Sequence, residues 1–160
     1  MLISFGGIAM KIMRIIIFSI ILIMGMSCAG RKTAIDVQDF ISIMEGEGFT
    51  VIDTTEQYDS SLIRQSFTAI DGTISVELII TPSNPDANQL YNQNKDRAEL
   101  RKGGNASSQS SISFGNKAKF TLNSSGVYYV ISKIDNTMLY IEVNSTNKKN
   151  VDEIVKKLGY

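Results

Sequence analysis

The sequence predicts one α+β domain: a mainly antiparallel sheet of about six strands with helices on one face. Three observations predict this class. Apolar residues recur at helical spacing in three segments, β-rich runs lie between them, and short loops join consecutive runs. About 130 residues follow the single cysteine, which suits one domain and is too few for two ordinary ones. The expected order of elements is αβββαβββα.

The first half of this order begins with an amphipathic helix. Thr33 and Asp36 precede it, glycines end it, and its apolar residues at i, i+3, i+4 and i+7 are Val37, Phe40, Ile41 and Met44. A strand is expected at 49–53. The runs 63–70 and 73–80 flank Asp71-Gly72, a dipeptide typical of a two-residue type I′ hairpin loop. Residues 69 and 74 would then oppose one another, which gives one apolar and one polar face.

The second half begins with a helix that Asn84 is placed to cap and that ends near Gly103. The serine-rich segment after Gly103 is expected to be a flexible connector. The remaining predicted strands cover residues 111–122, 127–134 and 137–143, and a last helix carries Val151, Ile154, Val155 and Leu158. IDGT at 70–73 and IDNT at 134–137 occupy equivalent points of the two halves. This suggests a divergent duplication of a helix followed by three strands.

The N-terminal segment has the pattern of a signal peptide. Lys11 and Arg14 precede an apolar block, 15–26, which is shorter than the roughly 20 residues that a membrane-spanning helix needs. Met10 is a second candidate start besides Met1. We expect a signal peptide at 1–28, a short tether at 29–34 and the folded domain at 35–160.

Small residues flank the cysteine in MGMSCAG, at 24–30. This stretch resembles the lipobox of bacterial lipoproteins, although Gly25 stands where a leucine or similar aliphatic residue is usual. The resemblance implies that Cys28 carries diacylglycerol and anchors the chain to the extracytoplasmic face of the cell membrane. With its Ile, Lys and Asn-rich composition, the chain resembles small lipoproteins of low-GC Gram-positive bacteria. The alternative is a secreted protein with an incidental cysteine.

The composition excludes several function classes. No histidine is present, and a lipidated Cys28 leaves no free thiol, so histidine- or cysteine-based nucleophilic catalysis and ordinary zinc sites are excluded. The only acidic cluster, Asp53, Glu56 and Asp59 in DTTEQYDSS, lacks the pattern of a calcium loop. We expect no cofactor, no metal and no enzymatic activity. Residues 29–160 hold 14 basic and 16 acidic residues, which supplies no field for nucleic acid. The basic residues gather in the second half, with 11 of them against 6 acidic residues in 87–160.

The hairpin 127–143 supplies the candidate binding surface. With Asp135-Asn136 as its turn, residue 132 opposes 139, and the aliphatic side packs under the helices. The other side is expected to be open to solvent and to carry Tyr129, Ile131, Lys133, Met138, Tyr140 and Glu142. The leading hypothesis is a lipid-anchored module that binds an envelope protein or polymer there. A small-solute binding lipoprotein and a carboxylate-dependent hydrolase of wall glycans are the alternatives.

Overall fold

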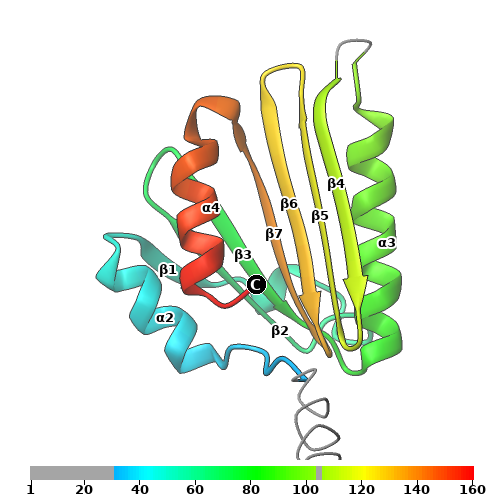
Figure 1. Cartoon of the computed structure of the whole chain (residues 1–160). Coiled ribbons are helices and arrows are strands. Elements are labelled where there is room, and N and C mark those ends of the chain that lie inside the picture. Colours follow the sequence, from blue (N-terminus) through cyan, green and yellow to red (C-terminus); the bar gives the residue numbers. More distant parts are fainter. Residues whose placement is uncertain (1–30, 104–105) are drawn as a thin grey trace, which may run out of the picture. The chain divides into compact units, whose positions relative to one another are not determined.

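The fold is built on one open antiparallel sheet, seen in a computed structural model that describes residues 31–103 and 106–160 (Figure 1). Within these residues seven strands lie in the order β1-β2-β3-β7-β6-β5-β4. The strands are β1 (Thr50–Asp53), β2 (Gln65–Ile70), β3 (Ser75–Ile80), β4 (Ala106–Phe114), β5 (Lys117–Ser124), β6 (Val127–Ile134) and β7 (Thr137–Asn144). The helices are α2 (Val37–Gly46), α3 (Asn84–Leu100) and α4 (Lys148–Lys157), and η1 (Thr55–Gln57) and η2 (Ser145–Asn147) are short 3-10 turns. The expected signal peptide and Cys28 lie outside the described residues.

Side-chain caps set the starts of α2 and α3. The Asp36 carboxylate accepts a hydrogen bond from the backbone N–H of Asp39 at 2.9 Å, as the sequence predicts. Ser83, and not Asn84, is the cap of α3, because the Ser83 hydroxyl accepts the backbone N–H of Asp86. The Asn84 side chain instead accepts a hydrogen bond from Lys133 Nζ at 3.0 Å.

The β2–β3 hairpin is confirmed, but its loop has four residues where two were predicted. The Asp71 carboxylate accepts the backbone N–H groups of Thr73 and Ile74 at 2.8 and 2.7 Å, which draws both residues into the turn. Ala69 therefore opposes Val76 instead of Ile74. Because this shift is two residues, each side chain keeps its predicted face.

The segment predicted to be a flexible connector forms most of a seventh strand, β4. Gly115, in the left-handed region at φ +59°, and Asn116 turn the chain between β4 and β5, so 111–122 is a hairpin and not one strand. β4 pairs with β5 from Ala106 to Phe114. The second half thus has four strands to the three of the first half, so the two halves do not share the predicted pattern of a helix followed by three strands.

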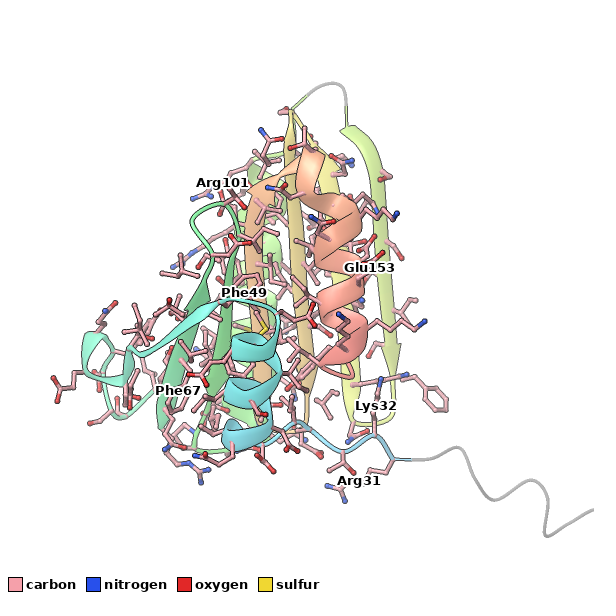
Figure 2. All side chains as sticks on the ribbon, turned by 90° about the vertical axis from the view of Figure 1, so that its left-hand side faces the viewer. Arg31, Lys32, Phe49, Phe67, Arg101 and Glu153 are labelled. Carbon is pink, nitrogen blue, oxygen red and sulfur yellow. The ribbon has the colours of Figure 1, made fainter. Side chains whose placement is uncertain are left out.

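The helices cover both faces of the sheet, so the prediction of helices on one face is wrong. In Figure 1, α2 and α4 lie on one side and α3 lies on the other. The cause is β6, in which seven of eight residues are buried, so that Val130 needs cover on one face and Ile131 on the other. Figure 2 looks onto the face that α2 and α4 cover.

Each face has its own apolar core. The larger core lies under α2 and α4, and its fully buried members include Phe40, Met44, Leu78, Val130, Leu139, Ile141, Val151 and Val155. The smaller core lies under α3 and includes Ile79, Tyr91, Phe120, Leu122, Ile131 and Met138. In the described residues, no helix is both long and apolar enough to cross a membrane.

Two phenylalanines near the β4 edge test whether α3 covers the smaller core. Phe120 is fully buried, whereas Phe114 is 59% exposed. We expect Phe120→Ala to lower the free energy of unfolding by about 3 to 5 kcal/mol, through lost burial and the cavity left behind. The matched change Phe114→Ala should cost less than about 0.5 kcal/mol. Urea unfolding of both variants measures this, and equal losses would contradict the assignment of the two faces.

Candidate functional site

A polar groove lies on the α3 side of the sheet, at the margin of the area that α3 covers. α3 packs mainly over β5, β6 and β7, and Ile79 of β3 also belongs to the core beneath it. The register brings Thr68 of β2, Glu77 of β3 and Tyr140 of β7 into one row across three adjacent strands. The groove has a volume of about 290 Å³. Its lining consists of Gln57, Tyr58, Thr68, Ser75, Glu77, Tyr140 and Glu142, and we call it the β3–β7 groove.

Glu142 is the most heavily hydrogen-bonded carboxylate of this groove. Arg101, just after α3, donates from Nη1 to both oxygens of Glu142 at 2.9 Å. The hydroxyls of Tyr140 and Tyr129 donate to the same carboxylate at 2.7 and 3.3 Å. Burial raises the pKa of Tyr140, and the hydrogen bond to the charged Glu142 raises it further. Tyr140 therefore stays protonated and acts as a donor at neutral pH.

Glu77 holds the opposite wall of the groove in place. Tyr58, from the loop after η1, donates its hydroxyl to Glu77, and Ser66 donates to the same oxygen at 3.0 Å. Thr54 donates in turn to Ser66 at 3.0 Å. Burial, together with the hydrogen bond to Glu77 and its charge, raises the pKa of Tyr58 to about 12. The loop is thus tied to the sheet by a chain of hydroxyls that ends on a carboxylate.

The structure separates the six residues that the sequence placed on one open face. They do share a face, and the predicted register of β6 and β7 is confirmed. The expectation that this face is open is wrong for Tyr129, Ile131, Lys133 and Met138, because α3 and its neighbours leave them at most 6% exposed. Tyr140 is half-buried and Glu142 is exposed, and both line the groove.

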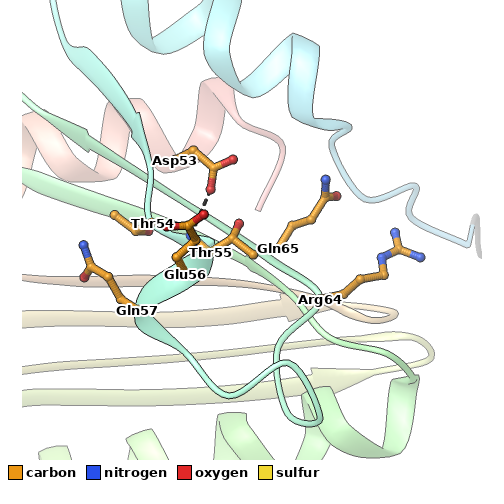
Figure 3. Close-up of a pocket in the computed structure, with 7 residues that line it drawn as sticks. All are labelled: Asp53, Thr54, Thr55, Glu56, Gln57, Arg64 and Gln65. Carbon is orange, nitrogen blue, oxygen red and sulfur yellow. Dashed lines mark hydrogen bonds between the residues drawn. The ribbon is translucent and has the colours of Figure 1, made fainter.

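A second hollow, of about 610 Å³, lies where β1 ends (Figure 3). Asp53, Thr54, Thr55, Glu56, Gln57, Arg64 and Gln65 line it. It contains part of the acidic cluster noted in the sequence, and two of those carboxylates serve local turns. Asp53 accepts the backbone N–H of Thr55 at 2.9 Å, and Asp59 accepts that of Ser61 at 2.8 Å. Hydrogen bonding by the side chain and backbone of Thr55 lowers the pKa of Asp53, and hydrogen bonding by the backbone and side chain of Ser61 lowers the pKa of Asp59. Within 31–103 and 106–160, no three acidic side chains are grouped closely enough to hold a metal ion.

The groove presents donors and acceptors together in a small area. Gln57 and Ser75 are exposed and can both donate and accept, while Glu77 accepts. The ring of Tyr58, 38% exposed, adds an apolar surface with a polar tip. This combination fits a neutral ligand that carries several hydroxyl groups.

Comparison with known proteins adds a structural likeness to this geometry. No known protein family matches the chain, and no curated protein matches it. The crystal structure of a GTP binding regulator from Thermotoga maritima is similar, with a TM-score of 0.46 and 17% sequence identity, over 78% of this chain and 84% of that one. At this level the likeness identifies neither a ligand nor an activity for this chain.

Sequence reasoning missed the residues that complete the groove. Tyr58 and Gln57 lie in DTTEQYDSS, where the sequence shows only an acidic cluster without the pattern of a calcium loop. The available signal for Glu77 is its place as the one charged residue in the strand SVELII. For Arg101 the sequence holds no signal, because its contact with Glu142 depends on where α3 ends.

Changing Glu142 should alter the titration of Tyr140. We expect Glu142→Gln to lower the pKa of Tyr140 toward its ordinary value of 10, because the charged acceptor of its hydroxyl is lost. In the native protein the folded-state pKa is raised, so stability from this tyrosine is present below pH 10 and lost as pH rises through the folded-state value. A pH titration followed by nuclear magnetic resonance of ring-labelled tyrosine measures the pKa of Tyr140 in the native protein and in the variant.

Two controls accompany this titration. Glu153→Gln on α4 removes an exposed carboxylate elsewhere and should leave Tyr140 unchanged. Tyr160, whose pKa burial raises to about 12, should titrate alike in all variants. An unaltered Tyr140 in Glu142→Gln would contradict the assigned contact.

Proposed function

We propose that this protein is a non-catalytic binding module, anchored by lipid on Cys28 to the extracytoplasmic face of the cell membrane, whose β3–β7 groove binds a hydroxyl-rich envelope polymer. The observation that carries the proposal is the convergence of Tyr58, Glu77, Tyr140 and Glu142 in one groove beside exposed amide and hydroxyl groups.

The groove suits a polysaccharide better than a charged ligand. Its two carboxylates repel anions, and Arg101, the only cation that contacts either of them among the described residues, is engaged by Glu142. Sugar hydroxyls can donate to Glu77 and accept from Gln57, and a sugar ring can lie on the exposed ring of Tyr58. Fixed partners hold these side chains in place before a ligand arrives, which lowers the entropic cost of binding.

The carboxylates of Glu77 and Glu142 are better suited to holding a ligand in position than to acid–base catalysis. Glycoside hydrolysis needs one carboxylic acid that can give up a proton and one carboxylate that is free to act. Both oxygens of Glu142 already accept hydrogen bonds, from Arg101 and two tyrosines. Glu77 accepts from Tyr58 and Ser66. These bonds support a role as fixed acceptors, and hydrolysis of wall glycans is the less favoured use of the pair.

A small-solute binder is the second candidate function. The hollow at the end of β1 favours it, since about 610 Å³ lies within the range of roughly 300 to 1,000 Å³ typical of ligand pockets. Its lining is polar, with Arg64 just before β2 and Gln65 at the start of β2 on one side and Thr54 and Thr55 on the other (Figure 3).

The anchor is tested by the intact mass of the protein purified from membranes of a producing bacterium. We expect a chain that begins at Cys28 and carries the added mass of diacylglycerol. Two acyl chains, at about 0.8 kcal/mol per buried CH₂, would keep such a protein in the membrane fraction. Cys28→Ala should lose this mass and leave the membrane fraction or retain residues 10–27. An unmodified native chain would overturn the lipid anchor.

The groove is tested by co-sedimentation with insoluble wall polysaccharide from the same bacterium. We expect Tyr58→Ala combined with Glu77→Gln to weaken binding by about tenfold or more, because central contacts carry most of the binding energy. The control pairs Leu100→Ala, 87% exposed, with Glu153→Gln, and should bind as the native protein does.

Three outcomes decide this test. Loss confined to the groove variant, with an unchanged circular dichroism spectrum, supports the proposal. Equal binding by both variants overturns the role of the groove. Release of reducing sugar by the native protein, lost in the groove variant, would show a hydrolase instead.

A further inference from the structure

A second surface, on the other face of the sheet, combines exposed apolar side chains with lysines. Ile112 and Phe114 on the edge strand β4 are 60% and 59% exposed. Ile112 pairs with Lys119 of β5, and Phe114 pairs with Lys117. These side chains point to the α2 and α4 side, because Lys119 continues the row through Ser132 to Leu139 of the larger core. We call Lys32, Ile112, Phe114, Lys117 and Lys119 the β4–β5 patch.

Within the described residues, the lysines of the patch form none of the ion pairs found. The ion pairs found there involve Lys95, Arg101, Lys148 and Lys157. Of the acids nearby, Asp152 is engaged by Lys148 and Tyr128, and Asp135 accepts from the Asn116 side chain. Burial lowers the pKa of Lys119 and Asp152 opposes this shift, while the charges of Lys32 and Lys148 each lower the pKa by a smaller amount. The patch is therefore a crowded cluster of positive charge.

The start of the folded chain is fixed within this patch. The backbone N–H of Lys32 donates to Asn116 Oδ1 at 3.3 Å, and Asn116 Nδ2 donates to the Lys32 carbonyl at 2.7 Å. Figure 2 shows Lys32 at the end of the sheet opposite to Arg101. Cys28 precedes Lys32 by four residues, which span about 14 Å at full extension.

We propose that the β4–β5 patch lies against a bilayer surface that contains anionic lipid, with its lysines on the headgroup phosphates and Phe114 and Ile112 at the acyl boundary. This inference rests on the proposed lipid anchor at Cys28, which would bring the patch within reach of the membrane. Lysine stems lie along apolar surface while the ammonium groups reach outward, so both parts of the patch suit one interface.

A second copy of the chain is the competing occupant, since β4 is an edge strand with unpaired backbone groups. Pairing two copies through β4 would bring two lysine clusters together, and neither supplies the negative charge that the other lacks. Charge complementarity therefore favours the lipid surface.

The test uses the native, membrane-purified protein with one reporter, Phe114→Trp, because the chain has no tryptophan of its own. The protein is reconstituted into phosphatidylcholine vesicles with brominated acyl chains, with or without phosphatidylglycerol. We expect bromine quenching of Phe114→Trp to be greater with phosphatidylglycerol. It should fall when salt rises from about 0.1 M to about 1 M, as the Debye length shortens from roughly 10 to 3 Å.

Two further variants complete the test. Leu62→Trp, a position 60% exposed before β2 near the other edge of the sheet, should show no such quenching. Adding Lys32→Glu, Lys117→Glu and Lys119→Glu to Phe114→Trp should abolish the difference between lipids, since each lysine near an anionic surface strengthens contact about fivefold.

The outcomes separate this inference from the proposed anchor. Equal quenching of the two reporters overturns the patch, while lipid mass on Cys28 in the same sample keeps the anchor. Quenching of Phe114→Trp by added anionic vesicles in a sample without lipid mass supports the patch and overturns the anchor. A dimer in detergent that the three glutamates dissociate assigns the patch to a second copy and overturns contact with lipid.

Discussion

The pairing of β3 with β7 is the interaction on which the rest of the structure depends. It is the only contact between strands that joins the two halves of the described sheet, and its partners lie about sixty residues apart in the chain. Leu78 against Leu139 supplies the larger core, Ile79 against Met138 supplies the smaller one, and Glu77 against Tyr140 forms the groove. One register therefore sets both cores and the site. Pairing strands so far apart in the chain lowers the chain entropy. The burial of aliphatic residues on both strands offsets this loss.

Periodicity predicted most of the helices and strands, but neither the strand β4 nor the sides of the sheet on which the helices lie. The helix at Phe40 and Met44 and the hairpin at Asp135-Asn136 are present as predicted, because local spacing and turn chemistry determine them. Two errors have physical causes. β4 consists mostly of serines with no apolar alternation, and the one sequence signal of its pairing to β5 is the Gly115-Asn116 turn, which lies inside the run predicted as a single strand. The face on which α3 packs depends on which face of the sheet the other helices leave uncovered, and this is a property of the whole fold.

The same misplacement of α3 explains why the candidate site was only partly predicted. Placing all helices under one face left Tyr129, Ile131 and Met138 open to solvent, where α3 in fact buries them. Tyr140 and Glu142 keep the accessibility that the sequence predicts, because they lie at the margin of the area that α3 covers. Their partners Tyr58 and Arg101 come from segments that approach only in the folded chain.

The two hydrogen bonds between Asn116 and Lys32 fix the start of the folded domain four residues after Cys28. In the proposed arrangement, with lipid on Cys28, at most about 14 Å of chain would separate the domain from its anchor, which corresponds to an effective concentration in the millimolar range at the bilayer. The proposed contact of three lysines and two apolar side chains with lipid would then need only a weak intrinsic affinity. The groove lies on the opposite face of the sheet from the β4–β5 patch, so the proposed contact would leave it directed away from the lipid.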